Sequence, residues 1–103
     1  MLNIVRERLE DALTVKLEGR LDTTTAPELE NALNEALADV KTLLFDMTAL
    51  EYISSAGLRV LLSTQKKMNR QGSMKLIGVS ETIMEIFEIT GFCDILTIEA
   101  LQE

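Results

Sequence analysis

The feature that most constrains the fold is the alternation of short apolar runs with longer amphipathic segments along the chain. Leu13, Val15 and Leu17 alternate with polar residues, which predicts a strand with one buried face. Residues 4–9 are a weaker strand candidate, and the short connection at 10–12 suits a hairpin between the two. The chain is therefore expected to begin with two paired strands.

A central strand is predicted at residues 42–47, TLLFDM, where only Asp46 interrupts the apolar run. Such a run is typical of a strand covered on both faces of a sheet. The next residues, TALEYIS at 48–54, are expected to form a loop that leads to a helix. A later run, MKLIGV, predicts another short strand, and residues 95–98 are a candidate for a last edge strand before a final short turn.

Three segments have the residue spacing of amphipathic helices. The first starts near Thr25, which stands three residues before Glu28 in a capping-box pattern. The second spans residues 55–70, and the third spans 81–90 after a Ser80 cap. Gly72 and Gly91 are the expected stops. The residues expected to face the core are Leu29, Leu33, Ala36, Leu37, Leu58, Leu61, Leu62, Met68, Ile83, Ile86 and Phe87.

The resulting order is β-β-α-β-α-β-α, and strand–helix–strand units favour parallel pairing with right-handed crossovers. We therefore predict an α/β fold in which a mixed sheet of four to five strands packs with three main helices. Periodicity leaves open whether the helices cover one face or both. A single domain over residues 1–103 is expected, because a chain of this length can close one core.

Composition excludes several classes of function. The net charge of −7 argues against a nucleic-acid partner. With one cysteine, Cys93, and no histidine, the chain has no zinc-type ligand set and no Ser-His-Asp arrangement. The sequence also has no phosphate-binding GxxxxGK[ST] loop and no run of about 18 apolar residues. Its first residues, MLNIVRERLE, lack an apolar stretch of the signal-peptide kind, so we expect no such peptide. We expect a cytoplasmic, monomeric protein without a cofactor, a membrane segment or catalytic activity.

The stretch EYISSAGL at residues 51–58 raises a more specific question about the start of the second helix. Ser54 or Ser55 is well placed to cap that helix. Gly57 costs about 1 kcal/mol in a helix relative to alanine, so a cap alone does not explain it. An anion or a phosphoserine at the helix start is a second explanation, and close packing is a third. Local features leave these open.

Four segments, GRLDTTTAPEL, LLFDMTALEYISSAGLRVLL, KLIGVS and IMEIFEITGF, resemble the STAS domain, specifically the stand-alone bacterial anti-sigma factor antagonists. The resemblance implies a switch protein in transcription regulation by partner switching. The unphosphorylated form would bind an anti-sigma factor that is a serine kinase, and so release the sigma factor. Phosphorylation at Ser55, favoured over Ser54, would abolish binding, and a PP2C-type phosphatase would reverse it. The implied partner-binding residues are Asp22, Thr23, Thr24, Asp46, Tyr52, Ser54, Ser55, Ala56, Gly57 and Arg59.

The chain departs from the family pattern at two positions, since Ser54 stands where many phosphorylated members have aspartate and Ala56 where they have a second hydroxyl. An unregulated STAS adaptor in a bacterial signalling complex is therefore the alternative. A receiver-like phosphotransfer enzyme using Asp46 is a third hypothesis, weakened by the lack of an adjacent acid pair for Mg²⁺. The family also implies that Asp22 and Asp46 both lie near the serine.

The second helix carries a basic stripe at Arg59, Ser63, Lys66, Lys67 and Arg70. Such a stripe is either a solvated face or a docking surface for an acidic partner. Arg59 stands four residues after Ser55, within reach of a phosphate there.

Overall fold

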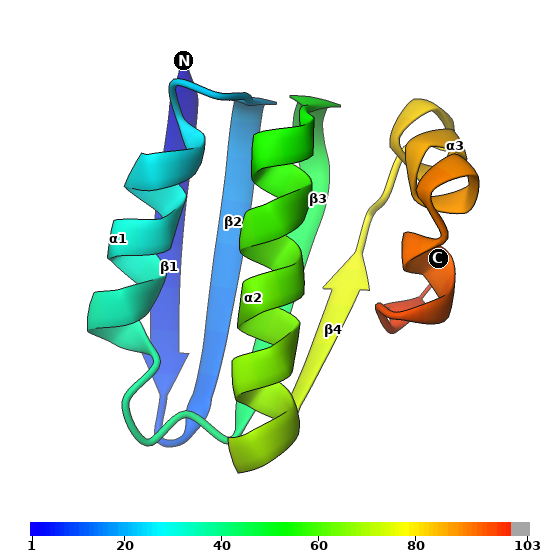
Figure 1. The fold of residues 1–103 in the computed structure, drawn as a ribbon. Helices are drawn as coiled ribbons and strands as arrows, with labels where there is room; N and C mark the ends of the chain where they lie inside the picture. Colours follow the sequence, from blue (N-terminus) through cyan, green and yellow to red (C-terminus); the bar gives the residue numbers. More distant parts are fainter. Residues whose placement is uncertain (100–103) are drawn as a thin grey trace.

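Residues 1–99 of the chain are described by a computed structural model. Five strands form one mixed sheet in the order β1-β2-β3-β4-β5 (Figure 1). The predicted α/β class and the order β-β-α-β-α-β-α are confirmed. The strands are β1 (Leu2–Leu9), β2 (Ala12–Leu21), β3 (Thr42–Ile53), β4 (Ser73–Ile77) and β5 (Ile98–Glu99); the helices are α1 (Ala26–Ala36), α2 (Ser55–Gln71), α3 (Glu81–Thr90) and the 3₁₀ turn η1 (Phe92–Asp94).

The predicted hairpin is present, since β1 and β2 pair antiparallel from Leu2 opposite Gly19 to Leu9 opposite Ala12. Glu10 takes a left-handed conformation in the tight turn, with φ 57°. All other neighbouring strands pair parallel. Parallel pairing is what a helix crossover between consecutive strands produces.

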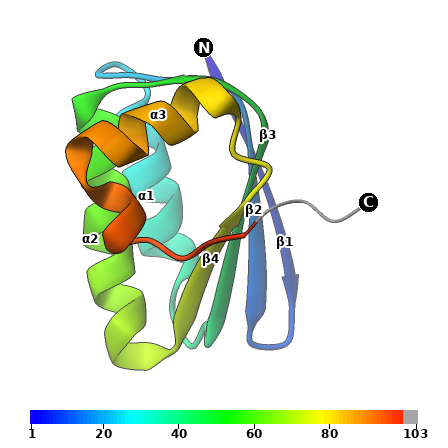
Figure 2. The same cartoon turned by 90° about the vertical axis from the view of Figure 1, so that its right-hand side faces the viewer.

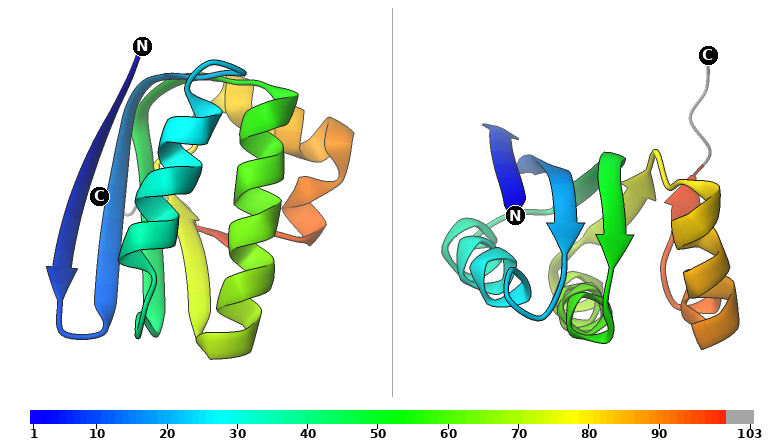
Figure 3. Two further views of the ribbon diagram at one scale, coloured as in Figure 1. Left: turned by 60° about the vertical axis from the view of Figure 1, so that its left-hand side comes forward. Right: turned by 90° about the horizontal axis from the view of Figure 1, so that it is seen from above.

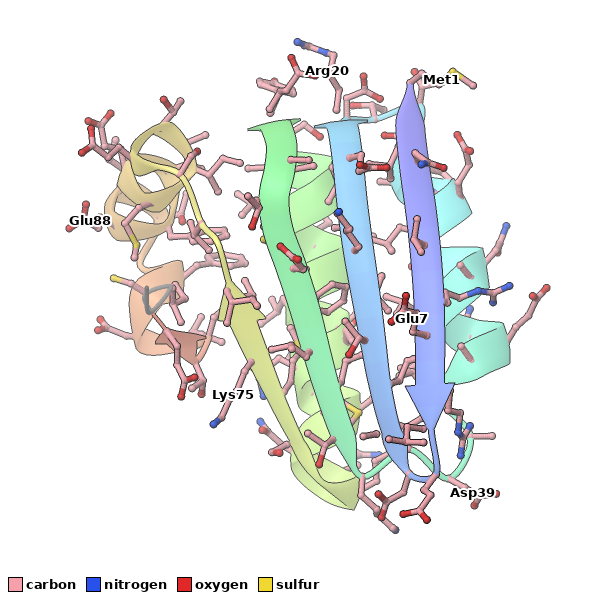
Figure 4. The ribbon with its side chains drawn as sticks, turned by 180° about the vertical axis from the view of Figure 1, so that it is seen from behind. Met1, Glu7, Arg20, Asp39, Lys75 and Glu88 are labelled. Carbon is pink, nitrogen blue, oxygen red and sulfur yellow. The ribbon has the colours of Figure 1, made fainter. Side chains whose placement is uncertain are left out.

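The helices lie on one side of the sheet, which answers the question that periodicity left open. Figure 2 shows the helices in one layer and the strands in the other, and Figure 1 shows α3 beyond the β4 edge. Within residues 1–99, no helix covers the opposite face of the sheet, which Figure 4 shows with Glu7 and Lys75 on its strands. The core therefore lies between one face of the sheet and the helix layer.

The prediction that residues 42–47 are covered on both faces is wrong. Leu43, Phe45 and Met47 are fully buried under the helices. Leu44 and Asp46 alternate with them and are only half-buried on the other face. The run looks continuously apolar because Leu44, on the face away from the helices, is also apolar although it is only half-buried.

The predicted loop at residues 48–54 is also wrong, because β3 continues to Ile53 and Ser54 alone links it to α2. The pairing with β2 continues through two register shifts, after Lys16 opposite Asp46 and after Gly19 opposite Leu50. At each shift β3 has one residue more than β2, which is the geometry of a β-bulge. The bulges break the regular alternation by which the sequence would have revealed a strand.

The bounds of α2 and α3 agree closely with the prediction, and both expected glycine stops are present at Gly72 and Gly91. Gly91 ends α3 in the left-handed conformation, with φ 81°. Ala36, Leu62 and Ile86, which were expected to face the core, are only half-buried. The last strand is shorter and later than expected, since Ile95 is 45% exposed and follows the turn η1. The expected final turn lies outside the described residues.

Candidate functional site

The candidate site lies at the end of the sheet where β2 and β3 finish and where α1 and α2 begin (Figure 3). In parallel strand–helix units the carboxyl ends of strands and the amino ends of helices meet at one edge. The N–H of Ser54 donates to the carbonyl of Leu21 at 2.9 Å, which ties the start of α2 to the last residue of β2. Figure 4 shows Arg20 at the same end.

Ser54 and Ser55 are adjacent but have different surroundings. Ser54 is the N-cap of α2, and its hydroxyl oxygen accepts a hydrogen bond from the Gly57 N–H at 3.4 Å. Ser55 is the first helical residue, and its side chain is exposed. Within residues 1–99, the Ser55 hydroxyl has no hydrogen-bond partner. The capping role therefore belongs to Ser54, and Ser55 is exposed beside it without a hydrogen bond to residues 1–99.

Gly57 is buried, and the packing of α2 explains why it lacks a side chain. A Cβ at this position would lie 2.7 Å from Leu21 Cγ and 2.9 Å from Ile53 Cγ1. Both neighbours are core residues at the ends of β2 and β3. Of the explanations left open by the sequence, close packing is therefore sufficient for this glycine, and an anion is not needed to account for it.

Asp22 organises the turn between β2 and α1. Its Oδ1 accepts hydrogen bonds from the N–H groups of Thr24 and Thr25, both at 3.0 Å. The Thr25 N–H is the largest cause of the lowered pKa of Asp22, and partial burial opposes it. The Thr25 hydroxyl donates to the Arg20 carbonyl at 2.8 Å and accepts from the Asp22 N–H at 2.8 Å.

These bonds explain why the predicted capping box between Thr25 and Glu28 does not form. Thr25 is the N-cap residue of α1, but it has helical backbone angles and its side chain makes no cap hydrogen bond. Its hydroxyl is committed to the preceding turn instead. The side chain of Asp22, and not that of Thr25, therefore accepts the backbone N–H bonds that order the turn before α1. Thr23 and Thr24 are exposed in this turn.

A groove of about 180 Å³ lies between the first turns of α1 and α2. Its floor is apolar, and an acid and a cation from opposite helices line it. Because Ala56 belongs to it, this α1–α2 groove begins beside Ser55. Its lining consists of Ala26, Pro27, Ala56 and Val60, with Thr23, Glu30 and Arg59 as the polar members. Sequence reasoning missed Glu30, because only the packing of α1 beside α2 brings it to the same groove as Arg59.

Tyr52 and Arg20 form a second contact at this end that the sequence did not predict. The Arg20 guanidinium carbon lies 4.4 Å from the centroid of the Tyr52 ring, in a cation–π geometry. The two residues are register partners in the β2–β3 ladder after its second shift. Tyr52 stays 38% exposed. No sequence signal could have found this pair, since the bulges determine which residues lie opposite each other.

Asp46 lies apart from the other predicted site residues, contrary to the expected neighbourhood with the serine. It is on the open face, where Lys16 of β2 lies opposite it. Its Oδ1 accepts hydrogen bonds from the Thr48 hydroxyl at 2.7 Å and the Thr48 N–H at 3.0 Å. The hydroxyl is the largest cause of the lowered pKa of Asp46. This carboxylate belongs to the uncovered sheet face rather than to the edge with α2.

The predicted basic stripe of α2 is exposed at Arg59, Lys66 and Arg70. Lys67 is also exposed, but its Nζ donates to Asn34 Oδ1 on α1 at 2.7 Å. The stripe therefore follows α2 from the α1–α2 groove, which Arg59 lines, to the last turn of the helix, and Lys67 contacts α1 along the way. The outward acids of α3 are Glu81, Glu85 and Glu88.

Residues 1–99 lack two other kinds of feature. No group of three or more histidine, cysteine, aspartate or glutamate side chains in that range is placed to hold a metal ion. Among the same residues, no helix combines the length and the apolar character that crossing a bilayer requires.

Comparison with known proteins identifies the family to which this chain belongs. The family model of the STAS domain matches residues 3–102. The chain therefore belongs to the STAS family, as its motifs predicted. It is 35% identical over 106 residues to the anti-sigma-B factor antagonist of Bacillus subtilis, covering 99% of this chain and 94% of the relative. It is 33% identical over 102 residues to the protein of that name from Listeria monocytogenes, covering 95% and 88%.

Solved structures share the fold. An anti-sigma factor antagonist from Mycobacterium paratuberculosis superposes with a TM-score of 0.86 at 24% identity, covering 95% of this chain and 85% of that one. SpoIIAA in its unphosphorylated form gives a TM-score of 0.76 at 16% identity, covering 97% and 90%. The phosphorylated form of Bacillus SpoIIAA gives 0.78 at 18%, covering 98% and 93%. At these identities the likeness is one of architecture.

Proposed function

We propose that this protein is an anti-sigma factor antagonist whose binding to its partner is controlled by phosphorylation of Ser55. The unmodified protein binds an anti-sigma factor that is also a serine kinase, and the sigma factor is released. The observation that carries this proposal is the free, exposed hydroxyl of Ser55 beside a cap that Ser54 already supplies. The relatives named as anti-sigma-B factor antagonists support the choice of partner.

The modification is a phosphoryl transfer from ATP, held by the kinase, to Ser55. A bond forms between Ser55 Oγ and the γ-phosphorus, the bond from that phosphorus to the β,γ-bridging oxygen breaks, and ADP leaves. The hydroxyl proton is released to the kinase or to water. A PP2C-type phosphatase returns the hydroxyl by hydrolysis, which yields inorganic phosphate. Both reactions need the serine oxygen to be accessible, and that of Ser55 is.

Phosphorylation should change binding without unfolding the protein. A phosphoserine adds about −1.5 to −2 charges near neutral pH. At the first position of α2 the helix dipole favours such a charge, by about 0.3 to 1 kcal/mol at an exposed site. A partner surface that fits the bare hydroxyl would instead have to desolvate a dianion, at a cost on the order of several kcal/mol. The affinity should therefore fall while the fold persists.

The proposed partner surface combines the two loops that meet at this end of the sheet. Thr23 and Thr24 are exposed in the turn that Asp22 orders, and Tyr52 is exposed at the end of β3. Arg59 begins the basic stripe, which would extend the surface toward an acidic region of the partner and raise the association rate. The other proposed members are Ser54, Ser55, Ala56 and Gly57, with Gly57 acting through the position of the helix. Asp46 would act only indirectly, from the open face.

A second candidate is an unregulated STAS adaptor, favoured by Ser54 in the place where many phosphorylated relatives have an acid. The two candidates are separated by incubating the protein with a kinase-like anti-sigma factor from the same genome and ATP. Phosphate is then located by mass spectrometry in the wild type, Ser55→Ala and Ser54→Ala. Label lost only in Ser55→Ala supports the switch. A firm complex without any label supports the adaptor and contradicts the switch.

A further inference from the structure

Arg59 is the only charged residue in the first two turns of α2, residues 55–62. It follows Ser55 by four residues, so it lies on the same helix face about 6 Å further along the axis. Its side chain is exposed. Within residues 1–99, its guanidinium has no carboxylate within 4.0 Å and donates no hydrogen bond. Arg59 is thus an exposed cation without an ion-pair or hydrogen-bond partner among residues 1–99, and it lies one helical turn from the proposed modification.

The remaining cations of the basic stripe are in different positions. Lys66 stands eleven residues after Ser55, about 16 Å along the helix axis. Lys67 is held by Asn34 on α1. Arg70 lies in the last turn of α2. Arg59 alone of these side chains can reach an anion on Ser55.

The other charged groups at this end of the sheet belong to α1, to the turn before α1 and to β2. Glu30 of α1 lines the same groove from the opposite helix. Asp22, in the turn before α1, already accepts two backbone hydrogen bonds. At the end of β2 and β3, Arg20 is stacked over Tyr52. Glu30 is therefore the acid that competes with a phosphate for Arg59.

We infer that Arg59 is a positioning residue that couples phosphorylation of Ser55 to the α1–α2 groove. A guanidinium can donate two parallel hydrogen bonds to phosphate oxygens. A phosphoserine carries about −1.5 to −2 charges, more than a carboxylate, and no carboxylate of residues 1–99 holds Arg59 within 4.0 Å. When Ser55 carries phosphate, Arg59 binds it and no longer lines the groove opposite Glu30. The groove then loses its cation and keeps its acid, so one modification alters both the serine and the neighbouring groove. This inference rests on the proposed function.

The test uses full-length protein with phosphoserine incorporated at position 55 during synthesis, so that no kinase is required. The second ionisation of the phosphate is followed by ³¹P NMR from about pH 4 to 8, around its usual pKa of about 6. A nearby cation favours the dianion and lowers this pKa. We expect the pKa to be about 0.15 to 0.4 unit lower in the wild type than in Arg59→Gln. Arg59→Lys should restore part of the shift.

Lys66→Gln is the matched control, because it removes one positive charge from the same helix face without touching the site. It should titrate like the wild type. The inference is overturned if Arg59→Gln has the same pKa as the wild type, or if Lys66→Gln raises it equally, which would indicate a general charge effect. Because the phosphoserine is built in, this result is independent of whether a kinase modifies Ser55. Absence of phosphate from the wild-type protein after incubation with the anti-sigma factor and ATP, by contrast, would count against the proposed function alone.

Discussion

Helices α2 and α3 begin in the same way and differ in the residue that comes directly after the cap. Ser54 and Ser80 both have extended backbone angles and accept a hydrogen bond from the third helical N–H, at 3.4 and 3.3 Å. After the cap, α3 has the acid Glu81, whereas α2 has the neutral Ser55 and no acid in its first turn. The comparison distinguishes the cap serines, Ser54 and Ser80, which hydrogen-bond to a helix N–H, from Ser55, which is exposed at the first helical position.

The comparison also shows that a negative charge is compatible with the first helical position in this fold. Glu81 is exposed at that position and complements the helix dipole. A phosphate on Ser55 would give α2 the same charge pattern. The start of α2 differs in its attachment, because Gly57 packs against the ends of β2 and β3, whereas α3 lies on the β4 side of the sheet (Figure 1).

The largest expected effect comes from Gly57→Ala. Helix propensity alone would stabilise the protein by about 1 kcal/mol. The new Cβ would meet Leu21 and Ile53 inside van der Waals distance, and overpacking of this kind typically costs about 1 to 3 kcal/mol. We expect a net loss in the free energy of unfolding, measured by urea denaturation. An increase in stability would show that close packing does not explain this glycine.

Removing either cap serine should have the next largest effect on stability. Ser54→Ala and Ser80→Ala should each lower the free energy of unfolding by about 1 kcal/mol, because each leaves a helix N–H without its partner. Ser55→Ala is the matched control and should change it by less than about 0.5 kcal/mol, as expected of a surface substitution. A loss in Ser55→Ala as large as in Ser54→Ala would contradict the assignment of the cap.

Exchanging the first residues of α2 and α3, Ser55 and Glu81, tests whether a negative charge at this position stabilises both helices. Ser55→Glu should keep or raise stability by about 0.3 to 1 kcal/mol at low salt, and Glu81→Ser should lower it by a similar amount. Both changes should shrink as salt is added, since the dipole interaction is screened. Thermal unfolding at two ionic strengths measures this. If Ser55→Glu unfolds the protein, a phosphate there would act by disrupting the fold and not by blocking a surface.

The smallest effect concerns acid stability. Asp22 and Asp46 have pKa values lowered from 3.8 by hydrogen bonds from Thr25 and Thr48. Their stabilising contributions are therefore complete above about pH 4 and are lost as the pH falls through the folded-state values. Asp22→Asn and Asp46→Asn should each flatten the decline in the free energy of unfolding below that pH. An unchanged decline would mean that these bonds do not favour the charged forms.

Much of the fold could be predicted because local signals suffice for several elements. The third helix is bounded by Ser80 and Gly91, and each acts through its own backbone geometry. The hairpin of β1 and β2 needs only alternation and a short turn. The second helix likewise combined an apolar stripe with a terminal glycine at position 72.

The errors arose where distant residues determine the local structure. Residues 48–53 form a strand because β2 offers a partner through two bulges, which no local pattern encodes. Thr25 looks like a capping residue, but a backbone carbonyl from β2 takes its hydroxyl. The α1–α2 groove needs Glu30 and Arg59 from different helices. Ser55 could be identified from its sequence motif, whereas the residues that surround it in space are known only from the packed structure.

The most direct test of the switch at Ser55 is calorimetric titration of the anti-sigma factor into protein with unmodified Ser55 and into protein carrying phosphoserine 55. Phosphoserine at Ser73, which is exposed at the start of β4, serves as the charge-matched control. We predict at least about a 100-fold weaker complex for phosphoserine 55, because desolvating the dianion costs several kcal/mol and each 1.4 kcal/mol is tenfold in affinity. The control should bind like the unmodified protein. Equal affinities for the protein with and without phosphate at position 55 would contradict the central claim.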